Sequence, residues 1–309
     1  MGTARANMTS VEELLPSVLA RLGADDPAGA VVTPLEGGIT NQNFRLALGG
    51  QEYVLRIGGR NAELLGIDRS REHAASALAA SLGIGAEVVF ADGSRDLMVT
   101  RFIRGSVMTS ETAAEPRTLR RLVDSIRRTH EGPEFPGVFS AFDAVRQLHR
   151  SAVEHGVSLP TEVAEALSRL TLIEQAIGRP DRPRPCHNDL LPGNFIDDGE
   201  RIRIIDWEYA AMGDRFFDLG NLAVNLSLNE DSCRALLAEY FGRTHPEDLA
   251  RVYLMRMASD MREACWGFLQ VGLSTLDFDF RAYGMKHLDR FLAHTAAPEF
   301  PSLLQQASA

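Results

Sequence analysis

Cysteine is scarce in this chain of 309 residues, and the three cysteines present lie far apart. Their odd number and the lack of a CxxC pair exclude a disulfide framework. A chain of this length can bury a substantial core without disulfides. The cysteine usage therefore favours a reducing compartment, and we expect a cytoplasmic protein.

Long apolar runs and an excess of positive charge are also missing. No run approaches the roughly 20 apolar residues that span a bilayer, so we expect no membrane insertion. The first residues, MGTARANMTS, lack the apolar segment of a secretory signal. Lysine and arginine number 32 against 42 aspartates and glutamates, a net charge of −10, which argues against nucleic-acid binding. An intracellular enzyme remains compatible with this composition.

The pattern of apolar residues predicts two regions of different structure. Helical spacing over residues 11–22 precedes short apolar runs, separated by Gly-Gly pairs, that predict three antiparallel strands over residues 30–59. An Ala-rich helix is expected over residues 70–82, capped by Ser70, followed by a hairpin over residues 86–103. We therefore expect a small antiparallel sheet with one main helix over residues 1–104.

Residues 105–309 are predicted to form a mostly helical second region. Its polar centre is the segment CHNDLLPGN and, after a DDGE turn, the segment IIDWEY. We expect two short strands there, helices before and after them to about residue 294, and a loose tail over residues 298–309. The fold class is α+β.

The segment from His187 to Asp206 carries the chemistry. A hairpin of this length can bring Asn194 and Asp206 together beside the loop of Asp189. Two carboxylates and an amide oxygen would then surround one point, and Mg²⁺ prefers such oxygen ligands. Phosphoryl transfer needs such a cluster, with one carboxylate for the attacking hydroxyl and others for the metal. The alternative interpretation is that these side chains only cap turns.

The two segments resemble the catalytic and metal-binding motifs of the aminoglycoside phosphotransferase and choline kinase superfamily, relatives of protein kinases. The resemblance covers roughly residues 30–295 and implies a bilobal, protein-kinase-like fold. It implies that Asp189 is the catalytic base, that Asn194 and Asp206 hold Mg²⁺, and that His187 braces the loop. Asp218, in DRFFDLGN, would support the catalytic loop, or would simply cap a helix.

The resemblance extends to an ATP site in the first region. The segment EGGITNQNF looks like the nucleotide loop of choline and ethanolamine kinases. The segment YVLRIGG looks like the strand that carries the phosphate-contacting cation. Residues 100–105 look like the hinge between the two lobes. The nucleotide-binding residues implied are Gly37, Gly38, Thr40, Asn41, Arg56, Glu72, Phe102 and Ile103. Glu72 would pair with Arg56. Alternatively, Arg56 is an exposed strand residue and Glu72 only favours a helix N-terminus.

Two further segments resemble choline kinases and imply an acceptor site for choline, ethanolamine or a related amino alcohol. Glu208 and Tyr209 stand in DWEYA, and Trp266 stands in a WG segment. Aromatic faces and carboxylates suit a quaternary ammonium, which cannot donate hydrogen bonds. The chain departs from the family pattern at Leu191 and Leu269, and Trp266 could instead belong to the core.

The sequence leaves other functions open. Phosphorylation of an aminoglycoside, thiamine or another small alcohol fits the same motifs. A non-catalytic, kinase-like nucleotide-binding protein is a second alternative, although Asp189, Asn194 and Asp206 are all present. The expected partners are a small-molecule acceptor and a nucleotide, and the oligomeric state is left open.

Overall fold

The computed structural model describes residues 11–24, 29–35, 41–59, 61–180 and 182–308. The chain forms two compact units. The first comprises residues 1–60 and 87–102, and the second comprises residues 61–86 and 103–309.

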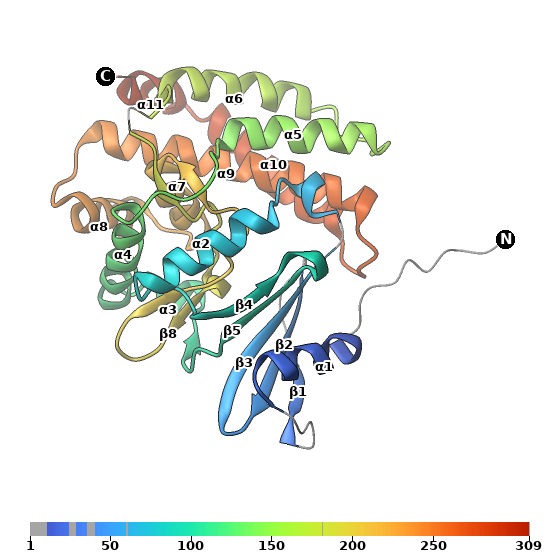
Figure 1. Ribbon diagram of the computed structural model, residues 1–309. Coiled ribbons are helices and arrows are strands. Elements are labelled where there is room, and N and C mark those ends of the chain that lie inside the picture. The colour runs from blue at the N-terminus through green and yellow to red at the C-terminus, as the bar shows by residue number, and fades with distance from the viewer. Residues whose placement is uncertain (1–10, 25–28, 36–40, 60, 181, 309) are drawn as a thin grey trace. The chain divides into compact units, whose positions relative to one another are not determined.

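The first unit is an antiparallel sheet with one helix. The strands follow the order β1-β2-β3-β5-β4 (Figure 1). The elements are α1 (Val11–Arg21), β1 (Val31–Leu35), β2 (Asn41–Leu48), β3 (Gln51–Gly58), β4 (Val88–Asp92) and β5 (Leu97–Arg101). The predicted strands and hairpins of this region are therefore confirmed.

Alternation along the strands gives this sheet one apolar face. Tyr53, Leu55 and Ile57 follow each other at every second position of β3 and are buried in one cluster with Leu14 and Val18 of α1. Because side chains alternate across a strand, Arg56 lies on the opposite face of the sheet. Its neighbours in register are Asn43 of β2 and Met98 of β5.

The second unit is mostly helical. Its helices are α2 (Arg69–Ser81), α3 (Ser110–Ala114), α4 (Pro116–His130), α5 (Ala141–Glu154), α6 (Val163–Ile177), α7 (Arg215–Asn225), α8 (Glu230–Phe241), α9 (Pro246–Leu273), α10 (Phe280–Ala296) and α11 (Phe300–Ala307). Its strands are β6 (Ser106–Val107), β7 (Arg184–Cys186), β8 (Phe195–Asp197), β9 (Ile202–Ile204) and β10 (Ala211–Gly213). Short 3₁₀ turns span Ala62–Leu65 and Pro192–Asn194 here, and Gly93–Arg95 lies in the first unit.

The compact units differ from the predicted division at residue 104 in two segments, residues 61–86 and residues 103–104. Residues 61–86, with the Ala-rich helix α2, group with the second unit. The reason is packing, because Ala75 and Ala79 are buried in the same apolar cluster as the long helix α9. The predicted cap is also displaced: Asp68, rather than Ser70, accepts the backbone N–H groups of Ser70 and Arg71.

The prediction of a loose tail over residues 298–309 is wrong. Residues Phe300–Ala307 form α11, which packs against α9 and α6 (Figure 1). Pro301 suits the first turn of a helix, where its missing N–H costs nothing, and Phe300 and Ala307 are buried at the two ends.

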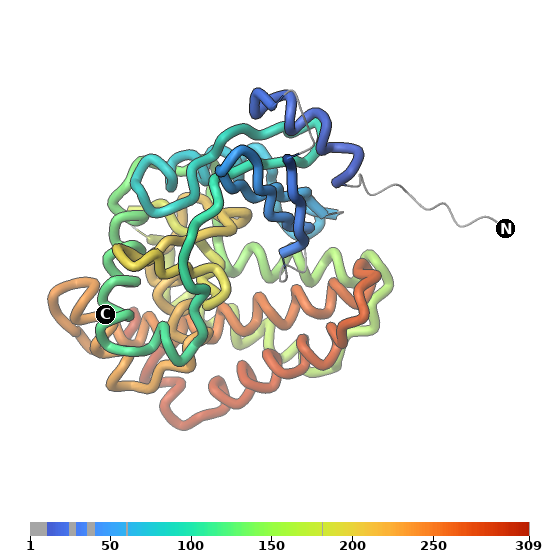
Figure 2. The backbone as a smooth tube through the Cα atoms, turned by 90° about the horizontal axis from the view of Figure 1, so that it is seen from below, coloured from blue at the N-terminus to red at the C-terminus, as the bar shows by residue number. Residues whose placement is uncertain are grey.

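The helix α9 is the central element of this unit. It packs against α5, α7, α10 and α11, and Figure 2 shows α10 running alongside it. Its 28 residues include Arg262, Glu263 and Trp266. Within the described residues, no helix is long and apolar enough to cross a membrane.

Candidate active site

The loop after β7 is held by a carboxylate of α7. Asp218 accepts the backbone N–H groups of His187 at 2.8 Å and Asn188 at 2.7 Å. His130 Nε2 donates to the same carboxylate at 3.0 Å, while His130 Nδ1 accepts the Tyr240 hydroxyl at 2.6 Å. All of these side chains are buried. Asp218 therefore fixes the loop backbone, as the resemblance implied.

One face of α7 continues this support. The Asn221 carboxamide oxygen accepts the Leu190 N–H, and Asn225 Nδ2 donates to the Leu190 carbonyl at 3.2 Å. Asn221 in turn donates to Ser259 of α9 at 2.9 Å. Sequence reasoning missed both asparagines. Their spacing from Asp218, three and seven residues, is that of one helical face and could have revealed them.

His187 connects the loop after β7 with the segment after β9. Its Nε2 lies 2.9 Å from the Ile205 carbonyl, so this nitrogen carries the hydrogen. Its Nδ1 accepts the Asp189 N–H at 3.2 Å, and Trp207 packs edge-on against the ring. Burial lowers the pKa of His187, which fits a neutral ring. These contacts are consistent with a bracing role, and the part that His187 takes in catalysis stays a prediction.

Two non-glycine residues of the site have left-handed backbone. The φ of Asn188 is 65° and that of Asp206 is 67°. Asn and Asp adopt this region more readily than other residues. Asn188 is locked by the Asp218 carboxylate and by its own Nδ2, which donates to the Tyr209 carbonyl at 2.9 Å. Such strained residues cluster at functional sites.

The predicted metal ligands Asn194 and Asp206 lie on backbone segments that are hydrogen-bonded to each other. Asn194 Nδ2 donates to the Asp189 carbonyl at 2.9 Å, so its side-chain oxygen is directed elsewhere. The Asn194 carbonyl accepts the Ile205 N–H at 3.0 Å, one residue before Asp206. Asp189, Asn194 and Asp206 therefore belong to one connected cluster. A carboxylate and an amide oxygen are donors that fit Mg²⁺.

Asp189 faces a buried arginine that the sequence did not single out. Arg262 Nη1 lies 3.1 Å from Asp189 Oδ1 and 3.1 Å from Glu263 Oε1, and its guanidinium stacks 4.3 Å from the Tyr209 ring centroid. Burial raises the pKa of Asp189 to about 7, against the opposing effect of Arg262 and with added repulsion from Glu263. A carboxyl with such a pKa can exchange a proton near neutral pH.

Trp266 lies at the edge of this cluster. The ring is partly buried, packs against the main core, and has Phe280 and Tyr283 as edge-to-face neighbours at 5.8 and 5.7 Å. The Tyr283 hydroxyl donates to Glu263 Oε2 at 2.7 Å. Contacts therefore link Trp266 through Tyr283 and Glu263 to Arg262 and Asp189. Leu269 is fully buried in the core.

Glu208 and Glu72 both form an ion pair with Arg69. Arg69 Nη1 lies 2.7 Å from Glu72 Oε2 and 3.5 Å from Glu208 Oε2. The structure thus joins α2 to the DWEYA segment through one cation. Glu72 was expected to pair with Arg56, which belongs to the first unit, and that pairing stays a prediction.

The other predicted nucleotide residues are distributed as follows. Gly37, Gly38 and Thr40 lie outside the described residues. Asn41 is the first residue of β2, and Arg56 lies in β3. Phe102 is the last residue of the first unit, and Ile103 is the first residue of the segment 103–309 of the second unit. Their contacts with a nucleotide stay predictions.

Comparison with known proteins agrees with the motifs. The model of the "Phosphotransferase enzyme family" matches residues 31–254. Protein LicA of Haemophilus influenzae is 31% identical over 217 residues, which are 68% of this chain and 62% of LicA. A probable ethanolamine kinase A of Dictyostelium discoideum is 25% identical over 298 residues, covering 84% of each chain.

A solved structure shares the fold over nearly the whole chain. The choline/ethanolamine kinase family protein of Mesorhizobium loti is 30% identical, with a TM-score of 0.80, and the match covers 96% of this chain and 99% of that one. This confirms the α+β, protein-kinase-like fold. Together with the family model over residues 31–254, it identifies the chain as a member of the phosphotransferase enzyme family.

Proposed function

We propose that this protein is an ATP-dependent kinase that phosphorylates the hydroxyl of a small cationic amino alcohol, choline, ethanolamine or a close relative. The observation that carries the proposal is the cluster in which Asp189 contacts Arg262 and is linked to Asn194. A braced loop presents a carboxyl of raised pKa beside two oxygen donors, which is what phosphoryl transfer to an alcohol requires.

The residues divide the work. Asp189 would orient the acceptor hydroxyl and accept its proton, and Asn194 and Asp206 would hold Mg²⁺. The metal would neutralise charge on the transferred phosphoryl group. His187 and Asp218 keep the loop in position, which matters because positioning supplies most of the catalysis in this class of reaction. For the nucleotide, Arg56, with the loop at positions 37–41, is proposed to contact phosphates, an arrangement supported by the resemblance.

The charges around Asp189 favour a cationic acceptor. Asp189 and Glu263 share the single charge of Arg262, and Glu208 shares Arg69 with Glu72. The group of Asp189, Glu263 and Arg262 therefore carries one net negative charge when both of its carboxylates are ionised. Arg262 already covers a face of Tyr209, so Trp266 is the aromatic ring proposed for an ammonium group.

The proposal is tested by ADP release with Mg-ATP and a panel of alcohols. The panel contains choline, ethanolamine, thiamine, homoserine, methylthioribose and kanamycin. Saturable turnover with choline or ethanolamine alone supports the proposed acceptor. Turnover only with kanamycin, or with none of the six, would contradict it.

Trp266→Ala should raise the KM for the amino alcohol by about 5- to 30-fold, because a cation–aromatic contact is worth about 1–2 kcal/mol. The KM for ATP should stay within about twofold, since no proposed nucleotide contact is lost. Steady-state kinetics on wild type, Trp266→Ala and Trp266→Phe would measure this, with the phenylalanine variant keeping an aromatic face. An unchanged acceptor KM in folded Trp266→Ala would remove Trp266 from the site.

Turnover should depend on the ionisation of Asp189. The base must be deprotonated, so kcat/KM should rise about tenfold per pH unit below pH 7 and level off above it. Glu263→Gln removes one neighbouring negative charge, which favours the carboxylate, so the rise should move to lower pH. Glu247→Gln, an exposed acid at the start of α9, serves as the control. A rise at the same pH in all three proteins would exclude Asp189 as the titrating group.

A further inference from the structure

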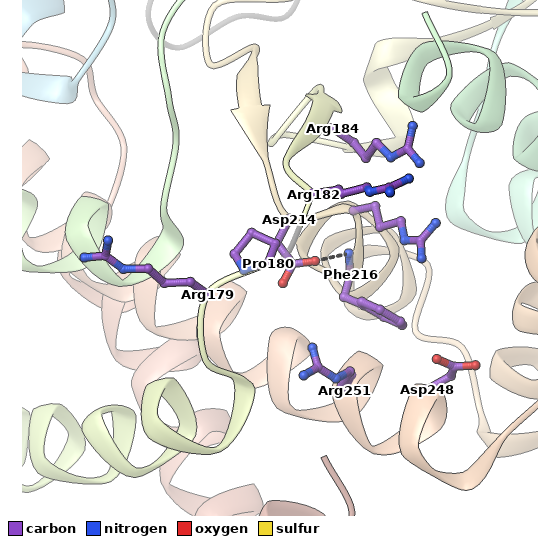
Figure 3. A pocket seen from close by; sticks show the side chains of 9 residues that line it. Arg179, Pro180, Arg182, Arg184, Asp214, Phe216, Asp248 and Arg251 are labelled. Carbon is purple, nitrogen blue, oxygen red and sulfur yellow. Dashed lines mark hydrogen bonds between the residues drawn. The ribbon is translucent and has the colours of Figure 1, made fainter. Parts of the chain in front are cut away.

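A second polar site lies at the start of α7, apart from the catalytic cluster. A pocket of about 470 Å³ opens where the segment after α6, the strand β7 and the first turns of α7 and α9 meet (Figure 3). Its volume is in the range of small-molecule sites. Its lining residues are Arg179, Pro180, Arg182, Arg184, Asp214, Arg215, Phe216, Asp248 and Arg251.

The lining is strongly basic in a chain whose net charge is −10. None of its five arginines forms an ion pair with a carboxylate in the described part of the chain. Arg251 donates to the Ile177 carbonyl at 2.9 Å, and Arg215 and Arg251 lie 5.8 and 5.6 Å from the Phe216 ring centroid. Figure 3 shows Arg182 and Arg184 extending together, while Arg179 points to the other side.

The two acids of the pocket do not neutralise this charge. Asp214 caps α7, where its carboxylate accepts the Phe216 N–H at 2.9 Å. Burial raises the pKa of Asp214 and of Asp248, so both carry their negative charge less readily than exposed carboxylates. Even with both ionised, five guanidinium groups outnumber them, and the amino end of α7 adds positive potential.

We propose that this pocket binds a small molecule that carries two or more phosphate groups. Guanidinium groups match phosphate oxygens in a planar, bidentate geometry, which suits several arginines around one compact anion. Asp189, Asn194 and Asp206 are not among the lining residues, so the site is separate from the proposed phosphoryl-transfer centre. The occupant is distinguished from a single inorganic phosphate by its charge and by its length across the arginines.

The test is calorimetric titration with tripolyphosphate, pyrophosphate and orthophosphate in buffer with EDTA and without magnesium. Four proteins are compared: wild type, Arg182→Gln/Arg184→Gln, the control Arg128→Gln/Arg234→Gln, and Arg56→Gln. The control removes two exposed arginines that pair with Asp124 and Glu230 outside the pocket. Arg56→Gln reports binding at the proposed nucleotide site.

The expected result is that tripolyphosphate and pyrophosphate bind wild type more tightly than orthophosphate does. The pocket double variant, folded by circular dichroism, should bind them at least about tenfold more weakly. The control double variant should stay within about twofold of wild type, and Arg56→Gln should keep the binding that the pocket double variant loses. Absence of binding to wild type at millimolar concentration would overturn the proposal. It would also be overturned if Arg56→Gln lost binding while the pocket double variant kept it. Equal binding by all four proteins would overturn it as well.

Discussion

Replacing Asp189 by Asn should reduce kcat by about 10²- to 10⁴-fold, the usual contribution of a positioned general base. Asparagine keeps an oxygen for the Arg262 guanidinium, which lies 3.1 Å from Asp189 Oδ1, so the loop should keep its conformation. The amide cannot accept the proton of the acceptor hydroxyl. The rate of phosphate transfer should therefore fall, while Mg-ATP affinity, which depends on other residues, should change by less than about threefold.

The variant to compare with Asp189→Asn is Asp206→Asn. Asp206 is proposed to hold the metal, so its replacement should weaken Mg-ATP binding as well as turnover. Stopped-flow or calorimetric binding of a non-hydrolysable nucleotide, measured beside kcat, separates the two variants. If Asp189→Asn lost nucleotide affinity as completely as Asp206→Asn, Asp189 would be a metal ligand or a structural residue.

The second large effect is expected at Asp218. Its carboxylate accepts three hydrogen bonds, from the His187 and Asn188 N–H groups and from His130. Asparagine has one acceptor oxygen, so in Asp218→Asn the side-chain NH₂ group would face at least one of these N–H donors in a buried place. The free energy of unfolding should fall by about 3 kcal/mol, and kcat should fall by about 100-fold because the loop carrying Asp189 loses its anchor.

Asp218 is a positioning residue, and its test needs a readout beyond stability. At a temperature where the variant is fully folded, kcat should be low while the KM for ATP stays near wild type. Asp124→Asn, which alters an exposed ion pair with Arg127 and Arg128 on α4, is the matched control. Normal kcat in folded Asp218→Asn would show that the hydrogen bonds to His187 and Asn188 stabilise the fold without setting the catalytic geometry.

The sequence predicted the local features of this protein well, because local spacing carries them. The strands of the first unit follow from alternating residues and Gly-Gly turns, and the loop from His187 to Asn194 follows from its motif. The pair of Arg69 and Glu72 is also local, three residues apart on α2, and could have been found by helical spacing.

Long-range contacts set the limit. Arg262 reaches Asp189 across 73 positions of the chain, and the Tyr283 hydroxyl reaches Glu263 across 20. Nothing in the spacing near α9 indicates that Arg262 would be buried against Tyr209, since an arginine on a helix is usually exposed. The same holds for α11, whose helix depends on the contacts that α9 and α6 offer.

The most direct test of the central claim is to observe the transferred phosphate itself. Phosphorus NMR of wild-type protein with Mg-ATP and ethanolamine or choline should show a new phosphomonoester signal that grows in step with ADP. Asp189→Asn should give this signal at least about 100-fold more slowly. ADP that forms without a phosphomonoester, or the same product at the same rate from Asp189→Asn, would contradict the assignment of this cluster as an alcohol kinase site.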